Sequence, residues 1–337
     1  MMKSQFGIQA LLLAVAGLAV FGCGGGGATT GGQDQAADQK LTVAVIPKST
    51  GGEFWETVER GARDAGKDLG VNVKWEGPLA ETEMAEQNKI IENMVNLGVD
   101  GMALAPLNNR AMRKPVENVV EAGIPVVIFD SAIDGDAHVS YVATNNEAGG
   151  VLAAEEMAKM LGDKKRVFVL RYIQGTASTE QRAKGFIKAI KAAGKEVLGE
   201  PYTDDATVTG AKKTATNSLE GFVKNSRLQL DGIFVTNLYS TLGMVEALED
   251  LRQSGVEVDV VFVGFDTSPK LIDELKAGNI DGLVSQRPHK MGYLAVETLV
   301  KHLRGEPIEP LVDTGVEFVT LERLENEPEI RELVGAD

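Results

Sequence analysis

The sequence predicts an α/β protein in which parallel sheets are flanked by helices. Short apolar runs alternate along the chain with amphipathic stretches whose apolar residues recur at helical spacing. This repeated alternation is typical of parallel sheets, because a crossover helix must carry the chain back before the next parallel strand begins. Several apolar runs also end on a single polar residue, the position at which open α/β sheets bind ligands.

The apolar runs predict nine strands, at residues 41–46, 71–75, 101–105, 126–129, 139–143, 167–171, 232–236, 260–264 and 282–285. The clearest amphipathic stretches predict helices at 53–69, 85–97, 179–193 and 242–254. The part of the chain from Leu41 onward has about three hundred residues, which is enough for two domains with cores of their own.

The two halves of the chain repeat one pattern. An Asp-Gly turn leads into a strand at Asp100 and again at Asp231. The helix that contains Gly61 likewise has a counterpart that contains Gly185. A repeated strand-helix unit predicts two similar lobes that face each other across a cleft, and two lobes imply a hinge.

The N-terminal residues predict an export signal that ends at the only cysteine of the chain. Residues 1–3 are a short basic start, 8–21 are an apolar stretch too short to span a bilayer comfortably, and 20–23 resemble a bacterial lipobox. We expect residues 1–23 to be a signal peptide and Cys23 to carry the lipid that anchors the protein to a membrane, in the periplasm or at the cell surface. Residues 24–40 have the composition of a flexible tether.

Charge and motif spacing argue against nucleic-acid binding and catalysis. The formal net charge is -15 at pH 7, whereas nucleic-acid binders need a basic face. Residues 61–68 have the spacing of a phosphate loop, but Asp68 stands where Ser or Thr is required and the run lies in a predicted helix. The three histidines show no ligand spacing. We therefore expect no catalytic residue, no metal and no cofactor.

Three predicted strands end on side chains suited to sugar hydroxyls, namely Asp130, Asn237 and Asp266. Carboxylates accept hydrogen bonds from neighbouring hydroxyls, and an amide both donates and accepts. Asp266 could instead cap a following helix, because residues 267–269 read Thr-Ser-Pro.

Two adjacent aromatic residues, Phe54 and Trp55, are candidates for the flat wall that packs against a sugar ring. Phe54 is in helical phase with Val58 and Ala62 and could simply be core, whereas Trp55 is in phase with Glu59. This spacing favours Trp55 as the ligand wall.

Taken in order, these motifs resemble the ribose-binding branch of bacterial type I periplasmic solute-binding proteins. The resemblance extends from residue 41 to about 319 and rests on Phe54-Trp55, Asp130, Thr144–Asn146 with Gly149-Gly150, Ser178–Arg182 with Gly185-Phe186, Asn237, Val263–Asp266 and Gln286. It implies two Rossmann-like lobes, 41–143 plus 287–315 and 144–286 plus 316–337. Three crossover segments, near Ala143, Gln286 and Gly315, would form the hinge.

The resemblance also implies a function and a set of ligand residues. The protein would be a monomer that captures a sugar or polyol in the cleft and delivers it to the permease of an ABC importer. Its ligand residues would be Phe54, Trp55, Asp130, Arg182, Asn237, Asp266 and Gln286.

The chain departs from the ribose-type pattern at Ser131, which follows Asp130 where ribose binders have Arg. The 46–48 segment and the Asp130-Ser131 pair are similar to autoinducer-2-binding relatives, which adds Lys48 and Ser131 to the candidate ligand residues. An autoinducer-2-like or chemosensory receptor of the same fold, and a secreted carbohydrate-processing enzyme, remain as alternatives.

Overall fold

The computed structural model describes residues 40–336. The predicted signal peptide, the lipid site at Cys23 and nearly all of the predicted tether lie outside the described residues. Within the described range, no helix combines the length and the apolar character needed to cross a membrane.

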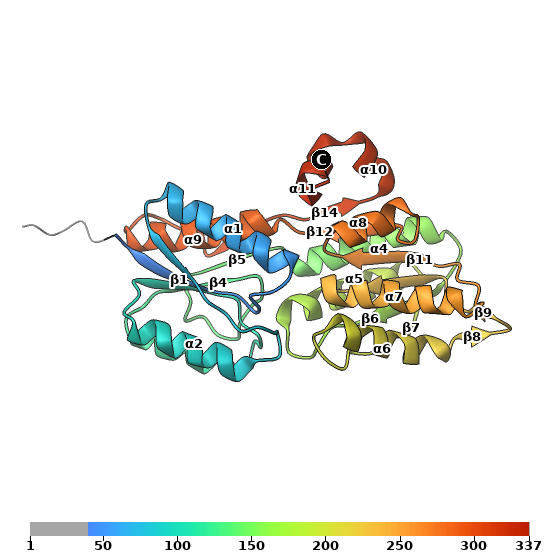
Figure 1. Ribbon diagram of the computed structural model, residues 1–337, viewed down its shortest axis with the longest axis horizontal. Coiled ribbons are helices and arrows are strands. Elements are labelled where there is room, and N and C mark those ends of the chain that lie inside the picture. The colour runs from blue at the N-terminus through green and yellow to red at the C-terminus, as the bar shows by residue number, and fades with distance from the viewer. Residues whose placement is uncertain (1–39, 337) are drawn as a thin grey trace, which may run out of the picture. The chain divides into compact units, whose positions relative to one another are not determined.

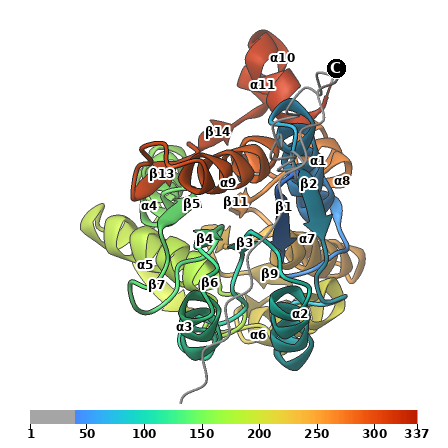
Figure 2. The ribbon, with the colours of Figure 1, turned by 90° about the vertical axis from the view of Figure 1, so that its left-hand side faces the viewer.

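The first lobe is built on a sheet of six parallel strands in the order β13-β5-β4-β3-β1-β2. The strands are β1 (Thr42–Ile46), β2 (Asn72–Trp75), β3 (Gly101–Leu104), β4 (Val126–Phe129), β5 (Ser140–Ala143) and β13 (Leu311–Asp313). Alternate residues of a strand point to opposite faces, so Val43 and Val45 pack under α1 (Glu53–Asp68) and α9 (Pro288–Leu303). Ala44 and Ile46 pack under α2 (Met84–Asn96) and α3 (Arg113–Glu121) on the other face (Figure 2).

The second lobe repeats this architecture with a sheet in the order β14-β12-β11-β10-β6-β7 (Figure 1). Its strands are β6 (Arg166–Leu170), β7 (Glu196–Gly199), β10 (Gly232–Val235), β11 (Val261–Phe265), β12 (Gly282–Ser285) and the antiparallel edge strand β14 (Glu317–Val319). One face is covered by α4 (Asn146–Leu161) and α5 (Ala177–Ala192). The other is covered by α6 (Val208–Glu220), α7 (Leu238–Gln253) and α8 (Pro269–Lys276), joined by α10 (Leu321–Asn326) and α11 (Pro328–Val334). A small hairpin, β8 (Val223–Lys224) and β9 (Arg227–Leu228), completes the lobe.

The sequence-based expectation of parallel sheets with flanking helices is confirmed, and all nine predicted strands are present to within one residue at each end. The strands that the apolar pattern did not predict are β7, β13, β14 and the two strands of the β8–β9 hairpin. They have two to four residues each and, apart from β14, are largely exposed or half-buried. A short strand at an edge has no continuous apolar run, because only part of its surface meets the core.

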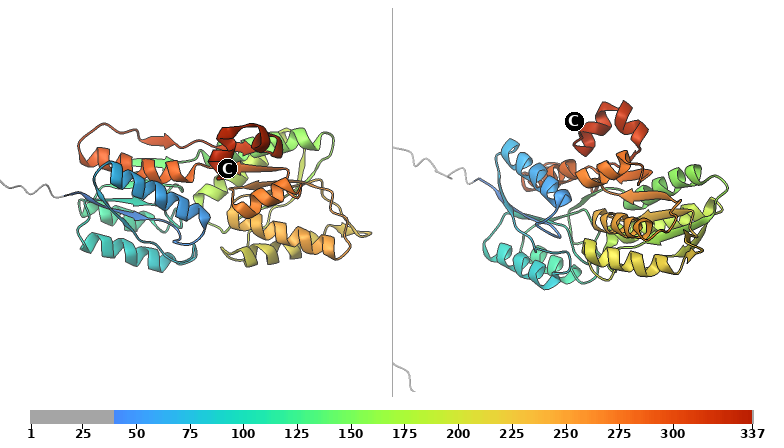
Figure 3. Two further views of the ribbon diagram at one scale, coloured as in Figure 1. Left: turned by 45° about the horizontal axis from the view of Figure 1, so that its top comes forward. Right: turned by 45° about the vertical axis from the view of Figure 1, so that its right-hand side comes forward.

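The chain passes between the two sheets three times, at residues 144–145, 286–287 and 314–316, where the crossovers were predicted. Two of these segments are bonded to each other. Thr144 Oγ1 and Thr314 Oγ1 are 3.3 Å apart, and the backbone N–H of Asn145 donates to Asp313 Oδ1 at 3.2 Å. Both views in Figure 3 show the lobes as separate blocks, the first mainly blue and the second mainly yellow and orange. The residue limits assigned to the lobes stay a prediction.

In each lobe two helices cross at facing glycines. A Cβ on Gly61 of α1 or Gly292 of α9 would lie 1.9 or 2.0 Å from a backbone oxygen of the other helix. A Cβ on Gly150 of α4 or Gly185 of α5 would lie 2.1 or 2.2 Å from the facing backbone. Only glycine permits such an approach. The repeated Gly61 and Gly185 motifs therefore mark the close helix crossing in each lobe.

Candidate ligand-binding site

Equivalent strands of the two lobes, β4 and β11, each end on an aspartate with a left-handed backbone. The φ angle is 61° at Asp130 and 71° at Asp266. The N–H of Asp130 donates to Val142 O on β5 at 3.1 Å, and that of Asp266 donates to Val284 O on β12 at 2.8 Å. Such a conformation costs a non-glycine residue about 1–3 kcal/mol and persists where the surroundings hold it. Each lobe thus fixes a carboxylate at the end of the equivalent strand.

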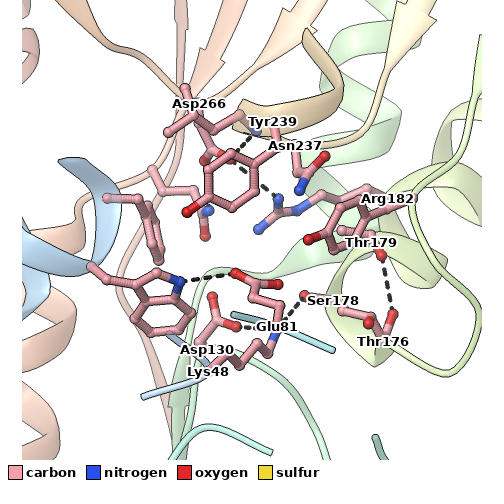
Figure 4. Close-up of a pocket in the computed structure, with 15 residues that line it drawn as sticks. Lys48, Glu81, Asp130, Thr176, Ser178, Thr179, Arg182, Asn237, Tyr239 and Asp266 are labelled. Carbon is pink, nitrogen blue, oxygen red and sulfur yellow. Dashed lines mark hydrogen bonds and ion pairs between the residues drawn. The ribbon is translucent and has the colours of Figure 1, made fainter. Parts of the chain in front are cut away.

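These two carboxylates face one narrow cavity between the sheets, with an accessible volume of about 30 Å³ (Figure 4). Its lining comes from both lobes: Lys48, Phe54, Trp55, Glu81, Asp130, Tyr172, Thr176, Ser178, Thr179, Arg182, Asn237, Leu238, Tyr239, Asp266 and Gln286. The structure therefore brings together eight of the nine predicted ligand residues. The ninth, Ser131, is buried behind the lining. The ligand contacts themselves stay a prediction.

Lys48 connects the first lobe to the second. Its side chain is buried, and Nζ lies 2.6 Å from Asp130 Oδ2. The same ammonium donates to Ser131 Oγ at 2.6 Å and to Ser178 Oγ at 3.3 Å. Ser131 Oγ donates to Ser178 Oγ at 2.8 Å and accepts from Ser178 N at 3.2 Å. An ammonium has three protons, so the donors of Lys48 are all engaged by protein groups. Ser131 acts through this network and not on the cavity surface.

The side chain of Arg182, on α5, lies at the cavity wall and contacts other elements of the second lobe. Arg182 is only 2% exposed, and its guanidinium stacks 3.9 Å from the ring centroid of Phe265. Nε donates to Asn146 Oδ1 at 2.8 Å and a terminal nitrogen donates to Thr236 O at 3.0 Å. The same terminal nitrogen lies 3.8 Å from Asp266 Oδ2. The planar fork is therefore held rigidly at the cavity wall.

Asp266 is held by groups from two other elements. Its Oδ1 accepts from Gln286 Nε2 at 2.8 Å, and its Oδ2 accepts from Leu238 N, the first residue of α7, at 2.9 Å. The helix that follows Asp266 is capped by Ser268, so Asp266 does not cap it. Burial raises the pKa of Asp266 above its ordinary value of 3.8, although Arg182 and both hydrogen bonds act in the opposite direction.

Asn237 combines a structural task with a place on the cavity wall. It is the N-cap of α7, and its Oδ1 accepts from Ser240 N at 3.2 Å. The Nδ2 group has no acceptor among the described residues. A ligand in the cavity would therefore meet a donor here.

The aromatic wall differs in one respect from the sequence-based interpretation. Trp55 is only 2% exposed and shares the buried side of α1 with Val58 and Ala62, whereas Phe54 is partly exposed. The expectation that Trp55 lies off the core face was wrong, because positions i, i+3 and i+7 of a helix share one side. Trp55 packs edge-on against Phe54 and Phe129, with ring centroids 5.0 and 6.3 Å away. It is both core and cavity wall.

Glu81 and two tyrosines are lining residues that sequence reasoning missed. Glu81 lies in the loop between β2 and α2, where no periodic pattern marks it, and its Oε1 accepts from Trp55 Nε1 at 2.9 Å. Tyr239 directly follows the Asn237-Leu238 pair, and its hydroxyl donates to Gly51 O across the cleft at 3.2 Å. Burial raises the pKa of Tyr239 to about 12. Tyr172 lies two residues beyond the end of β6, so the strand-end rule could have found it.

The first turn of α5 supplies the remaining polar lining. Ser178 and Thr179 belong to this turn, and Thr176 is its N-cap residue. The Thr179 hydroxyl donates to Thr176 O at 3.2 Å. Within residues 40–336, no group of three or more His, Cys, Asp or Glu side chains is arranged to hold a metal ion.

The fold and the cavity are those of a two-lobe solute-binding protein. Residues 43–307 match the family described as "Periplasmic binding protein domain", and the chain belongs to this family. The chain is 28% identical to the D-ribose/D-allose-binding protein of Pseudomonas aeruginosa, over 84% of this chain and 89% of the relative. It is also 28% identical to the D-allose-binding periplasmic protein of Escherichia coli, over 82% and 88% of the two chains.

Solved structures agree with this assignment. A carbohydrate transporter solute-binding protein from Agrobacterium radiobacter in complex with D-arabinose superposes with a TM-score of 0.81 at 32% identity, over 88% of this chain and 100% of the other. An ABC transporter solute-binding protein from Agrobacterium vitis with bound D-fucose gives 0.79 at 34% identity, over 87% and 99% of the two chains.

Proposed function

We propose that this protein captures a sugar or a closely related polyol outside the cytoplasm and delivers it to an ABC importer. The relatives and solved structures named above, which bind ribose, allose, arabinose and fucose, support a sugar as the ligand class. The description of the family, a periplasmic binding protein domain, supports a role in binding.

The observation that carries the proposal is the pair of carboxylates at equivalent strand ends of the two lobes. Asp130 and Asp266 reach one cavity from opposite sides, with Arg182 and Asn237 as donors and the Phe54-Trp55 wall beside them. A polyol needs this mixture of acceptors, donors and a flat apolar surface. A ligand that contacts both lobes favours the closed arrangement by its differential contacts.

The mature protein is proposed to be a monomer held to a membrane by a lipid on Cys23. The apolar stretch and the 20–23 segment support this location. Delivery to a permease requires only local diffusion at the membrane surface, which a tether permits.

Calorimetry with purified protein tests the function. A panel of pentoses, hexoses, polyols and autoinducer-2 should yield one class that binds with Kd at about micromolar, equivalent to roughly -8 kcal/mol. Small-angle scattering should show compaction with saturating ligand if closure accompanies binding. Binding of autoinducer-2 alone would favour the signalling receptor, chemical conversion of a bound sugar would favour an enzyme, and binding of no panel member would refute the proposal.

A further inference from the structure

The charges around the cavity do not balance. The lining contains two cationic side chains, Lys48 and Arg182, and three acidic ones, Glu81, Asp130 and Asp266. Each cation already faces one aspartate, at 2.6 Å for the Lys48–Asp130 pair and 3.8 Å for the Arg182–Asp266 pair. With all five groups ionised, the cavity keeps one uncompensated negative charge. Glu81 is the carboxylate that remains.

Glu81 is placed to meet a ligand. One carboxylate oxygen accepts from the Trp55 indole N–H at 2.9 Å, and the group has no ion pair with any described residue. Figure 4 shows its carboxylate at the middle of the cavity, between the strand-end aspartate of the first lobe and Arg182. Burial raises the pKa of Glu81 above 4.5, and the charge of Lys48 and hydrogen bonds from Trp55 and Tyr172 only partly offset this rise.

Glu81 is half-buried, and a carboxylate that has no ion-pair partner there is unfavourable, because removing a charge from water is costly unless an opposite charge or several donors compensate it. If a neutral sugar bound, the charge of Glu81 would stay uncompensated, or Glu81 would have to take up a proton. A ligand that brings its own cation would remove the imbalance. The donors of Lys48 are already engaged and Arg182 is paired with Asp266, so neither cation that lines the cavity forms an ion pair with Glu81 among the described residues.

Building on the sugar-binding function proposed above, we propose that the preferred ligand is an amino sugar, a sugar that carries a protonated primary amine, and that Glu81 pairs with its ammonium group. The carboxylates of Asp130 and Asp266 and the guanidinium of Arg182 would hold the ring hydroxyls. Glu81 would therefore determine specificity between a charged sugar and its neutral parent.

Calorimetry with matched ligands tests this assignment. The probes are 2-amino-2-deoxy, 3-amino-3-deoxy and 6-amino-6-deoxy hexoses and the corresponding neutral hexoses, at about pH 6.5, where such amines are protonated. At least one amino sugar should bind about 10- to 100-fold more tightly than its neutral parent. Glu81→Gln should abolish that preference while the neutral parent binds as well as before or better.

The control is Glu86→Gln, which removes the same charge from an exposed side chain on α2 whose ion-pair partner is Lys89. This variant should keep the preference. Repeating each titration in two buffers of different ionisation enthalpy reports proton uptake. An amino sugar should bind to the wild type without proton uptake. A neutral sugar should bind to the wild type with uptake of a proton, and this uptake should be absent in Glu81→Gln.

The outcomes separate this inference from the function it rests on. A neutral sugar that binds the wild type at least as tightly as every amino sugar would overturn the inference and leave the sugar receptor intact. A preference for the amine that persists in Glu81→Gln would also overturn it, because the ammonium would then sit elsewhere. Failure of all sugars, charged and neutral, would refute the proposed function itself.

Discussion

Replacing Lys48 with Met tests whether the buried network at the cleft supports the fold. Lys48 is 2% exposed and is the ion-pair partner of Asp130, which is 4% exposed. Removing one partner leaves the other charge buried, which typically costs about 3–5 kcal/mol. We therefore expect Lys48→Met to lower the free energy of unfolding by about that amount. Urea titration at neutral pH, followed by circular dichroism, measures the change.

A double variant and a control sharpen this test. Lys48→Met combined with Asp130→Asn removes both charges, so it should lose less stability than Lys48→Met alone, although it deletes more polar groups. Lys114→Met removes an exposed ammonium from a surface pair and should change stability by less than about 0.5 kcal/mol. The reasoning fails if Lys48→Met lies within about 1 kcal/mol of wild type, or if the double variant loses as much as the sum of its single changes.

Four further predictions concern binding, pH, packing and anchoring. Asp266→Ala should weaken sugar binding by about 2–4 kcal/mol, roughly 30- to 1,000-fold in Kd, because the partners of Asp266 are left unpaired. A change in Kd of less than twofold by calorimetry would show that Asp266 does not contact the ligand. Burial raises the pKa of Glu81, so the stability that this group contributes is present below its ordinary value of 4.5 and is lost as pH rises through the raised value. In urea titrations, the free energy of unfolding of Glu81→Gln should thus increase relative to that of wild type as the pH rises from about 4 to about 7. A difference between the two proteins that does not change with pH would contradict this. Gly61→Ala should cost about 2–4 kcal/mol because its Cβ would lie 1.9 Å from the backbone of α9, whereas Gly221→Ala, whose nearest atom is 3.6 Å away, should be near neutral. Cys23→Ser should shift the expressed protein from the detergent phase to the aqueous phase, and identical partitioning would exclude the lipid.

The strand-end residues show why much of the site could be predicted. The carboxyl ends of parallel strands lie at one edge of a sheet. Once two facing sheets are expected, Asp130, Asn237 and Asp266 are therefore expected to lie near the cleft between them. The repeated Gly61 and Gly185 motifs similarly carried information about packing, because a helix crossing at this distance needs glycine.

Two features of the site have no local signal in the sequence, namely the position of Glu81 and the contact of Lys48 with the second lobe. Glu81 lies in an irregular loop, and its place in the cavity depends on where that loop passes Trp55. The role of Lys48 depends on Ser178, which is 130 residues away in the chain and belongs to the other lobe. Periodicity reports which face of an element is buried, and it contains no information on which distant element provides the partner.

The order of segments along the chain has a consequence for biogenesis. The first lobe is complete only when α9 and β13, at residues 288–303 and 311–313, have joined it. These two elements are synthesised after every strand of the second-lobe sheet except β14. Until then the α1 face, with Val58, Ala62 and Ala65, has no helix to cover it. The nascent chain therefore cannot finish folding its first lobe before most of its length has emerged.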